Sequence, residues 1–388
     1  MSEMAVGSPE RSSARVALTP VTPGVHSPTR ALPVEERAAV GLDPRLEPPD
    51  QPLQHLAFSE ERLAQLTAEQ LIVRRVPDMH GVSRIDMPGA RNVVAGVGGD
   101  FVVAGSEHVY RLARLDERAE VLAPVPRLGP TTMLPAADSS DHFWLLYEGI
   151  QTLPEFDLQE TVVSPFVSVL SWTQLSDFDG RAVSNPGDGS FIYTTPRGLR
   201  RVNAEGRAHD ILLQSLGPQV WRLLPAQGRG RVWAATPWLL QLLQRVESEH
   251  SSGTARSGTE LEVTRRIELP PHSVALASEG SELAVLAVES FEPARARLRV
   301  ELYRQGSEGR RVLRFDDPLP EHADAGAAKA GVAQFAPEVA LAPGRPWVAV
   351  FGFGLSVFDW RTGARLFPPG AAAASAFLPV QNLAPGPP

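Results

Sequence analysis

Three aspartates and an asparagine in one short stretch are the residues best suited to bind a metal ion. Asp177, Asp179, Asn185 and Asp188 lie within DFDGRAVSNPGDG, and carboxylate and amide oxygens are the ligands that Ca²⁺ prefers. An EF-hand loop has glycine at its sixth position, whereas Gly180 is fourth in this stretch. A tight turn rich in Asp, Asn and Gly is therefore the favoured interpretation. Asp177, Asp179 and Asp188 remain the candidate metal ligands.

No other pattern in the sequence indicates a cofactor or a catalytic residue. The nine histidines are scattered and form no pattern typical of a zinc site. Lys329 is the only lysine, and neither a Walker A motif nor a Gly-x-Ser-x-Gly motif occurs. The glycine-rich stretch 96–100 is followed by Phe101, where a dinucleotide fingerprint requires its third glycine. The absence of cysteine excludes disulfides and thiolate chemistry. We expect no cofactor and no catalytic residue.

Tryptophan and arginine are the residues that indicate a binding surface. Trp238 and Trp360 stand beside turns and are the candidate interface residues, whereas three tryptophans within apolar runs are expected in the core: Trp144, Trp233 and Trp347. Four arginine pairs lie in or beside expected strands, where neighbouring side chains point to opposite faces: Arg74–Arg75, Arg200–Arg201, Arg265–Arg266 and Arg310–Arg311. Surface charge paired with carboxylates explains these pairs, and a basic rim for an acidic partner is the alternative.

The charge balance excludes several classes of partner. The formal net charge is −8, and because Lys329 is the only lysine, 36 of the 37 basic residues are arginine. That bias indicates a high-GC bacterial genome, and a net acidic chain argues against binding nucleic acid or an anionic membrane. The first residues lack the apolar region of a secretory signal, and no apolar run approaches the ~18 residues of a membrane helix. We expect a cytoplasmic protein.

Short apolar runs recur along most of the chain and indicate the elements that carry these residues. Most of these runs follow a turn of Gly, Asp, Ser or Glu, and two or three further short apolar runs surround each of them. The first apolar residues of the seven runs are Leu63, Phe101, Phe143, Phe191, Val232, Leu283 and Trp347. Four short strands in ~40–50 residues are typical of a propeller blade. The sequence predicts an all-β fold, a single seven-bladed β-propeller of four-stranded antiparallel blades.

The recurring runs also set the expected organisation of the chain. The proline-rich composition of residues 1–50 predicts a disordered tail, with one helical turn near Val34–Val40. The propeller is expected in residues 51–382. A C-terminal tail is expected in residues 383–388. The stretch 62–75 has a helical pattern, but LAFSEERLAQL resembles LASEGSELAVL at 276–286, which favours strands. The polar stretches 246–262 and 316–334 are expected to be surface loops. Residues 370–382 form either an additional outer strand or a tail.

The sequences of single blades resemble those of known propeller families. DGSFIYTTPRGLRRVNAEG and GRVWAATPWLLQLL are similar to blades of bacterial propellers of the two-component-regulator, NHL and YVTN kinds. The resemblance extends over roughly residues 53–380 and is well developed in three or four blades. The Trp-Asp dipeptide and the Gly-His opening of WD repeats are missing. The chain also resembles the propeller modules of MoxR ATPase–von Willebrand A systems, without a motif that separates that family from other propellers.

Two functions are compatible with a propeller of this kind. The first is a non-enzymatic scaffold that presents one face to a protein partner, and it is the favoured hypothesis. The alternative is a propeller hydrolase or lyase of the lactonase kind with a divalent metal at the mouth of its channel. Asp100, Asp141 and Asp188 each precede the second run of a blade and are conceivable ligands for that metal.

Overall fold

A computed structural model supplies the coordinates. The chain divides into two units, residues 1–30 and residues 31–388, and every residue described below lies in the second unit. The structure describes residues 34–37, 55–67, 69–79, 82–96, 99–105, 108–113, 119–124, 132–135, 142–146, 158–164, 166–173, 182–184, 190–195, 198–203, 208–211, 220–246, 260–292, 295–318, 337–368, 373–380 and 382–383.

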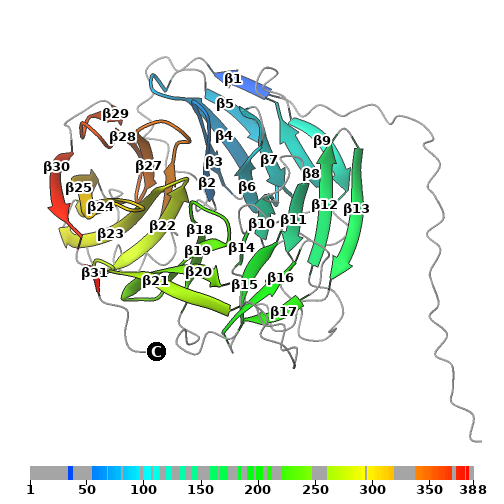
Figure 1. Cartoon of the computed structure of the whole chain (residues 1–388). Helices are drawn as coiled ribbons and strands as arrows, with labels where there is room; N and C mark the ends of the chain where they lie inside the picture. Colours follow the sequence, from blue (N-terminus) through cyan, green and yellow to red (C-terminus); the bar gives the residue numbers. More distant parts are fainter. Residues whose placement is uncertain are drawn as a thin grey trace, which may run out of the picture. The chain divides into compact units, whose positions relative to one another are not determined.

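The described strands form seven antiparallel sheets, numbered here in chain order and shown in Figure 1. Sheet 1 consists of β2 (His55–Ser59), β3 (Arg62–Leu66), β4 (Gln70–Arg75), β5 (Val82–Asp86) and β1 (Val34–Arg37). Sheet 2 consists of β6 (Asn92–Ala95), β7 (Phe101–Ala104), β8 (His108–Leu112) and β9 (Ala119–Pro124). Sheet 3 consists of β10 (Thr132–Pro135), β11 (His142–Leu146), β12 (Leu158–Ser164) and β13 (Phe166–Thr173).

The remaining four sheets follow the same order from the inner to the outer strand. Sheet 4 consists of β14 (Ala182–Ser184), β15 (Phe191–Thr195), β16 (Gly198–Val202) and β17 (Ala208–Ile211). Sheet 5 consists of β18 (Arg222–Pro225), β19 (Arg231–Ala235), β20 (Leu239–Val246), β21 (Glu260–Glu268) and β31 (Asn382–Leu383). Sheet 6 consists of β22 (Ser273–Glu279), β23 (Glu282–Glu292), β24 (Arg295–Arg304), β25 (Gly309–Pro318) and β30 (Ala374–Pro379). Sheet 7 consists of β26 (Glu338–Leu341), β27 (Trp347–Phe351), β28 (Leu355–Asp359) and β29 (Arg365–Phe367).

The recurring apolar runs occupy one place in every sheet. Each of the seven residues that begin these runs lies on the second strand of a different sheet: Leu63, Phe101, Phe143, Phe191, Val232, Leu283 and Trp347. The stretch 62–75 forms β3 and β4, so the prediction of strands in place of a helix is confirmed. The all-β class and the four-stranded antiparallel blade are confirmed as well.

The stretches 56–66 and 276–286, which resemble each other in sequence, also share the conformation of their turns. In sheet 1 the hairpin between β2 and β3 turns at Glu60, whose φ is 52°, and in sheet 6 the hairpin between β22 and β23 turns at Gly280, whose φ is 55°. Glycine adopts this left-handed region without steric cost, and glutamate does so at some cost. The two stretches therefore form the same tight hairpin.

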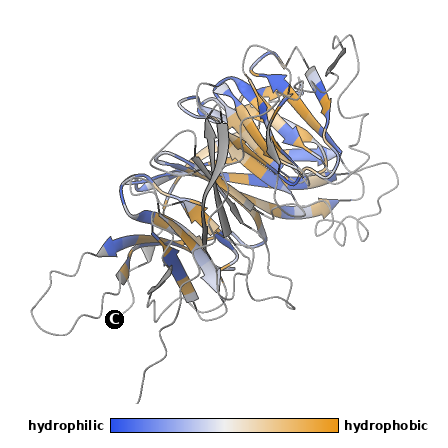
Figure 2. Ribbon diagram, turned by 90° about the vertical axis from the view of Figure 1, so that its right-hand side faces the viewer, coloured by the Kyte–Doolittle hydropathy of each residue, from blue (hydrophilic) through white to orange (hydrophobic). Residues whose placement is uncertain are grey.

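The sheets pack face to face through apolar side chains. Among the described side chains, six clusters each join two neighbouring sheets, and one of them joins sheet 7 to sheet 1. Each innermost strand also contacts the innermost strands of the neighbouring sheets, including β26 with β2. Figure 2 shows apolar residues along the strands and hydrophilic residues at many turns and strand ends. The unit is thus a β-propeller in which the last sheet packs on the first.

Three additional outer strands extend the four-stranded sheets. Val34–Arg37 form β1 and pair with β5, so a helical turn beginning at Val34 is wrong. Of the two alternatives for residues 370–382, an additional outer strand is correct for the described residues. β30 pairs with β25 of sheet 6, and β31 pairs with β21 of sheet 5. The other residues of the predicted tail 1–50 lie outside the described residues.

Candidate interaction groove

The predicted metal ligands do not form a described site. Asp177, Asp179, Asp188 and Asp141 all lie outside the described residues. Asp100 is described and buried, and its carboxylate accepts a hydrogen bond from Arg111 Nε at 2.6 Å. Within the part of the chain that the structure describes, no group of three or more His, Asp or Glu side chains is arranged to hold a metal ion. Asp100 thus forms an ion pair within sheet 2.

The tryptophans differ in their exposure. Trp144 and Trp233 are buried between sheets, as predicted, and Trp347 is partly buried with Arg345 over its ring at 5.6 Å. Trp238 lies at the turn between β19 and β20 and is 69% exposed. Trp360, after β28, is partly buried and packs against the cluster between sheets 6 and 7. Trp238 and Trp360 remain the candidate interface residues.

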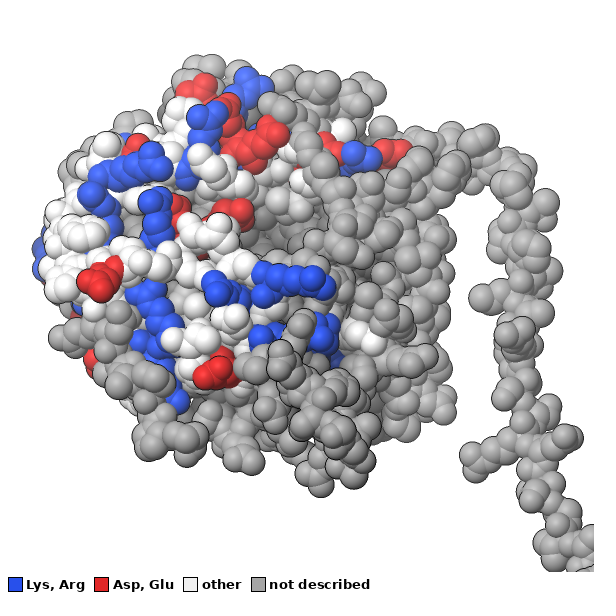
Figure 3. Space-filling view, in the orientation of Figure 1, with Lys and Arg blue, Asp and Glu red and all other residues white. Residues whose placement is uncertain are grey.

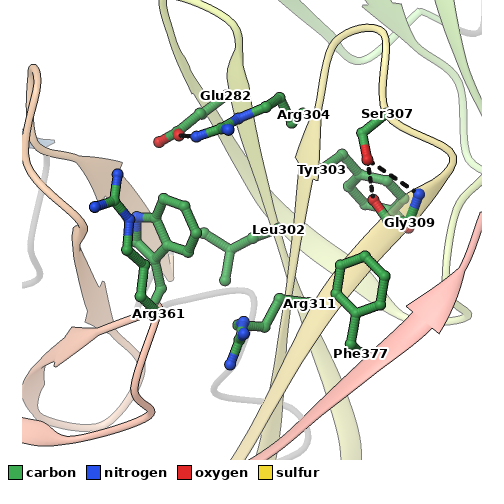
Figure 4. A pocket seen from close by; sticks show the side chains of 10 residues that line it. Glu282, Leu302, Tyr303, Arg304, Ser307, Gly309, Arg311, Arg361 and Phe377 are labelled. Carbon is green, nitrogen blue, oxygen red and sulfur yellow. Dashed lines mark hydrogen bonds and ion pairs between the residues drawn. The ribbon is translucent and has the colours of Figure 1, made fainter.

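A pocket of about 250 Å³ lies where the outer strands of sheet 6 pass beside Trp360 of sheet 7 (Figure 4). We call it the interaction groove and define it by its lining residues: Glu282, Leu302, Tyr303, Arg304, Ser307, Gly309, Arg311, Trp360, Arg361 and Phe377. Leu302 lies in the middle of the view in Figure 4, with Arg361 on one side and Phe377 on the other. Sheet 6 has a fifth strand, β30, whereas the outer strand of sheet 7 has three residues. The outer part of sheet 6 therefore extends past its neighbour and leaves this face open.

Phe377 is the most exposed large apolar side chain of the interaction groove. It lies on β30 opposite Arg311 of β25, and 69% of its surface is exposed. A Cβ atom on Gly309 would lie 2.0 Å from Phe377 Cζ, so only glycine at this position lets the ring lie against the backbone. Ser307 Oγ accepts a hydrogen bond from Gly309 N at 3.1 Å and fixes the turn that presents this glycine. The exposed ring is thus held in place.

Positive charge predominates in the interaction groove. Arg304, Arg311 and Arg361 line it together with a single carboxylate, Glu282, which pairs with Arg304 at 2.7 Å. Arg311 Nη1 donates to Ser375 Oγ at 3.0 Å, and the guanidinium of Arg361 lies 5.4 Å from the ring centre of Trp360. Figure 3 shows Arg side chains spread over the left part of the molecule, where sheets 5 to 7 lie. An acidic chain therefore carries a locally basic groove with apolar walls.

A buried carboxylate fixes the turn of sheet 7 that packs on sheet 6. Asp317 lies near the end of β25 and is 2% exposed, and its Oδ2 accepts hydrogen bonds from Phe353 N at 2.6 Å and Gly354 N at 3.2 Å. A Cβ atom on Gly352 would lie 2.7 Å from Asp317 Oδ2, so glycine is required for this approach. Asp317 thereby ties the hairpin of β27 and β28 to sheet 6.

Asp317→Ala is expected to lower the free energy of unfolding by about 2–3 kcal/mol, because hydrogen bonds to charged groups contribute ~1.5–3 kcal/mol. The measurement is urea denaturation of the full chain. The adjacent Asp316 is the control, since it forms exposed ion pairs with Arg295 and Arg297, and Asp316→Ala should cost at most about 1 kcal/mol. Equal losses for the two variants would contradict the proposed role of Asp317.

The other face of sheet 6 contains a buried ionic cluster. Glu301 of β24 is fully buried, accepts a hydrogen bond from the Tyr303 hydroxyl, and forms ion pairs with Arg299 and with Arg310 Nε, the latter at 3.3 Å. Burial raises the pKa of Tyr303, so its hydroxyl stays protonated and can donate to Glu301. Arg265 Nη2 of sheet 5 donates to the carbonyl oxygen of Ser307 at 2.7 Å. Arg265 thereby links sheet 5 to the turn between β24 and β25, whereas the ion pairs of Glu301 lie within sheet 6.

Two residues of the arginine pairs, Arg74 and Arg201, are buried. Arg74 is 9% exposed and lies 5.4 Å from the ring centre of Phe367, and burial lowers its pKa to about 10. Arg201 is 8% exposed and donates through Nε to Ser190 Oγ at 3.0 Å. Surface charge paired with carboxylates is therefore wrong for these two residues, which make contacts inside the unit, and Arg310 pairs with the buried Glu301.

A second polar group lies where three innermost strands begin. His55, Arg222 and Glu338 are the first residues of β2, β18 and β26, and Arg222 Nη2 lies 3.8 Å from Glu338 Oε2. Burial lowers the pKa of His55, and Arg222 lowers it further, whereas Glu338 raises it. The ring therefore stays neutral near pH 7.

His55 predicts a loss of stability on mild acidification. Because its pKa in the folded state lies below the 6.5 of the unfolded chain, the unfolded state binds more protons below that pH. Stability should therefore fall as the pH drops below about 6.5 and stop falling below the pKa of the folded state. Thermal melts of the wild type and His55→Gln at pH 7.5 and pH 5.5 test this. The melting temperature of His55→Gln should fall less between pH 7.5 and pH 5.5 than that of the wild type. An equal fall in both proteins would contradict the role of His55.

Comparisons with known proteins support the fold and nothing finer. No protein-family model matches this chain, and no curated protein matches its sequence. A solved structure of Kluyveromyces lactis Hsv2 has a TM-score of 0.50 at 8% identity, over 80% of this chain and 93% of that one. The same protein with loop 6CD replaced by a Gly-Ser linker has a TM-score of 0.51 at 10% identity, over the same shares of the two chains.

A third solved structure has a slightly lower TM-score. The β-propeller domain of Cps50 (Swd1) from Myceliophteria thermophila has a TM-score of 0.49 at 10% identity, and the match covers 83% of this chain and 99% of that domain. At identities of 8–10%, the likeness to these solved structures shows a shared fold only.

Among the described residues, no helix is long and apolar enough to cross a membrane.

Proposed function

We propose that this β-propeller is a non-enzymatic scaffold that binds a protein partner through the interaction groove. The observation that carries the proposal is the combination of an exposed aromatic side chain, Phe377, with a partly buried one, Trp360, across a groove rich in arginine. Aromatic side chains and arginine are the residues enriched at the centres of protein interfaces. The apolar walls supply area to bury, and the arginines select the charge of the partner.

Rigidity of the surrounding structure supports this role. The ring of Phe377 lies against Gly309, Asp317 ties the neighbouring hairpin of sheet 7 to sheet 6, and Arg265 of sheet 5 donates to Ser307 of sheet 6. A surface that is ordered before binding loses less conformational entropy when its partner arrives. The groove therefore has the preorganisation that a binding site requires.

Site-specific crosslinking tests the proposal. Phe377 is replaced by benzoylphenylalanine in the cells that produce the protein, and the same photoreactive residue at Arg91 is the control, because Arg91 is exposed on sheet 2. We expect a discrete crosslinked protein from position 377 that is absent from position 91. The affinity of the purified pair should then fall at least about tenfold for Trp360→Ala, a loss of ~1.4 kcal/mol or more. Identical products from both positions, or an unchanged affinity, would contradict the proposal.

The sequence supports the wider setting of this proposal. We place the blades of the propeller in residues 51–382, and the flanking segments 1–50 and 383–388 contribute β1 and Leu383 of β31 as additional outer strands. We group it with bacterial propellers of the two-component-regulator, NHL and YVTN kinds, because the sequences of its blades resemble theirs. The lack of cysteine and the excess of arginine over lysine support a bacterial cytoplasmic protein. The net charge of −8 supports a protein partner over nucleic acid or an anionic membrane.

A further inference from the structure

The outer edge of sheet 6 is open among the described residues. β30 is the last strand of this sheet, and no described strand pairs with its other edge. Figure 1 shows β30 at the far left of the molecule, outside β25. Its sequence, ASAFLP, contains no charged residue, although proteins commonly protect such edges with charge. Ala374, Ser375, Phe377 and Pro379 are exposed. An uncharged, exposed edge of this kind can pair with another chain.

The register of β30 identifies the backbone groups that point outward. Val380 N donates to the carbonyl oxygen of Glu308 at 2.6 Å, and these two residues lie directly opposite each other in the antiparallel ladder. Residues alternate in such a ladder, so Ala374, Ala376 and Leu378 bond toward β25. Ser375 and Phe377 therefore direct both N–H and C=O away from the sheet. Pro379 directs only its carbonyl oxygen outward, because proline has no N–H.

The residue before β30 confirms this alternation. Ala373 is next in the outward series, and its N–H donates to the carbonyl oxygen of Gly363 at 3.0 Å. Gly363 belongs to the turn of sheet 7 that follows Trp360 and Arg361, so this turn covers the beginning of the edge. The open part of the edge consequently runs from Ser375 to Pro379 and starts beside that turn.

The open edge and the interaction groove adjoin. Phe377 and Arg311 are directly opposite in the ladder and point to the same face of the sheet, and Arg311 also donates to Ser375 Oγ. A strand added beyond β30 would direct alternate side chains toward this face. Those side chains would meet Arg311, Arg361 and the apolar surface of Trp360, whereas Arg304 already has Glu282 as its partner.

We propose that the edge of β30 from Ser375 to Pro379 binds an extended acidic segment of the protein partner as an additional strand, with alternate side chains of that segment in the interaction groove. Main-chain hydrogen bonds supply affinity in this mode of recognition, and the alternate side chains supply specificity. The excess of arginine selects Glu or Asp in the segment. The inference rests on the proposed function, because it names how that partner is held.

Synthetic peptides and the full chain test the inference. The probe is a fluorescein-labelled peptide of alternating Glu and Val, and its binding is followed by fluorescence anisotropy. Ser375→Pro removes one outward N–H and leaves the bonds to β25 intact, whereas Ser375→Ala keeps that N–H and removes the contact with Arg311. We expect Ser375→Pro to weaken binding about tenfold or more and Ser375→Ala to change it about threefold at most.

Two further comparisons test the pairing and the charge. Methylating every second amide nitrogen of the peptide should abolish binding, because those groups can no longer pair with an edge. Arg361→Glu should weaken binding of the acidic peptide and strengthen binding of a Lys–Val peptide, whereas Arg91→Glu on sheet 2 should change neither. Equal binding of the methylated and unmethylated peptides would overturn the inference, as would wild-type binding by a correctly melting Ser375→Pro variant.

The remaining outcomes separate this inference from the proposed function. If the crosslink at position 377 forms equally in Ser375→Pro, the partner uses the interaction groove without the edge, and only the inference fails. If neither the crosslink nor the peptide complex forms, both fail. Sedimentation velocity identifies a different occupant: a wild-type dimer that Ser375→Pro converts to monomer would show that the edge pairs with a second copy of this chain, which also overturns the inference.

Discussion

Trp233→Ala is expected to lower the free energy of unfolding by about 3–5 kcal/mol, the usual cost of truncating a buried tryptophan. Trp233 is 3% exposed and packs with Ala235 in the apolar cluster between sheets 5 and 6. Both side chains therefore face the same neighbouring sheet, as the alternation of VWAA predicts. The lost packing weakens one contact of the propeller, and the loss is large beside a typical total stability of ~5–15 kcal/mol.

Trp238→Ala is the matched control for this prediction. Trp238 lies five positions further along the chain and is 69% exposed, so its removal should change the free energy of unfolding by about 0.5 kcal/mol or less. Urea denaturation followed by circular dichroism measures both variants. Similar losses for Trp233→Ala and Trp238→Ala would show that the cluster between sheets 5 and 6 does not control stability.

Repetition made the fold predictable from the sequence. Each blade repeats an apolar run after a polar turn, and this pattern placed Leu63 and Leu283 on equivalent strands more than two hundred residues apart. The same comparison showed that Arg62–Leu66 form a strand despite a helical pattern of apolar residues. Local sequence decided these elements, because a four-stranded blade is a local unit with short connections.

The groups that support the interaction groove could not be predicted in this way. Asp317 lies in the polar stretch 316–334, for which the sequence predicts a surface loop. However, β25 continues to Pro318, and the Asp317 carboxylate is buried against the next sheet. Its partners lie 36 and 37 residues away. Phe377 follows an alanine-rich stretch that was compatible with a tail. Contacts between sheets depend on residues far apart in the chain, and a repeat pattern contains no information about them.

Buried charge shows most clearly what the repeat pattern omits. Glu301 occupies a strand position that periodicity assigns to an inward side chain, and a carboxylate is stable there only because charged partners surround it. Arg299 and Arg310 stand on the two sides of Glu301, on β24 and β25, with side chains 18% and 20% exposed. Removing the carboxylate therefore leaves two largely buried guanidinium groups without this counter-charge.

Glu301→Gln is accordingly expected to lower the free energy of unfolding by about 3–5 kcal/mol, the usual cost of breaking a buried ion pair on one side. Tyr303→Phe removes only the hydroxyl donor and should cost about 1–2 kcal/mol. Glu292→Gln is the control, because Glu292 forms exposed ion pairs with Arg295 and Arg297 that contribute at most about 1 kcal/mol. Denaturation at low and at high salt separates the two kinds of pair, since salt screens exposed charges much more than buried ones. A loss for Glu301→Gln that disappears at high salt would show that the cluster is open to solvent, and it would contradict the proposed role of this buried carboxylate.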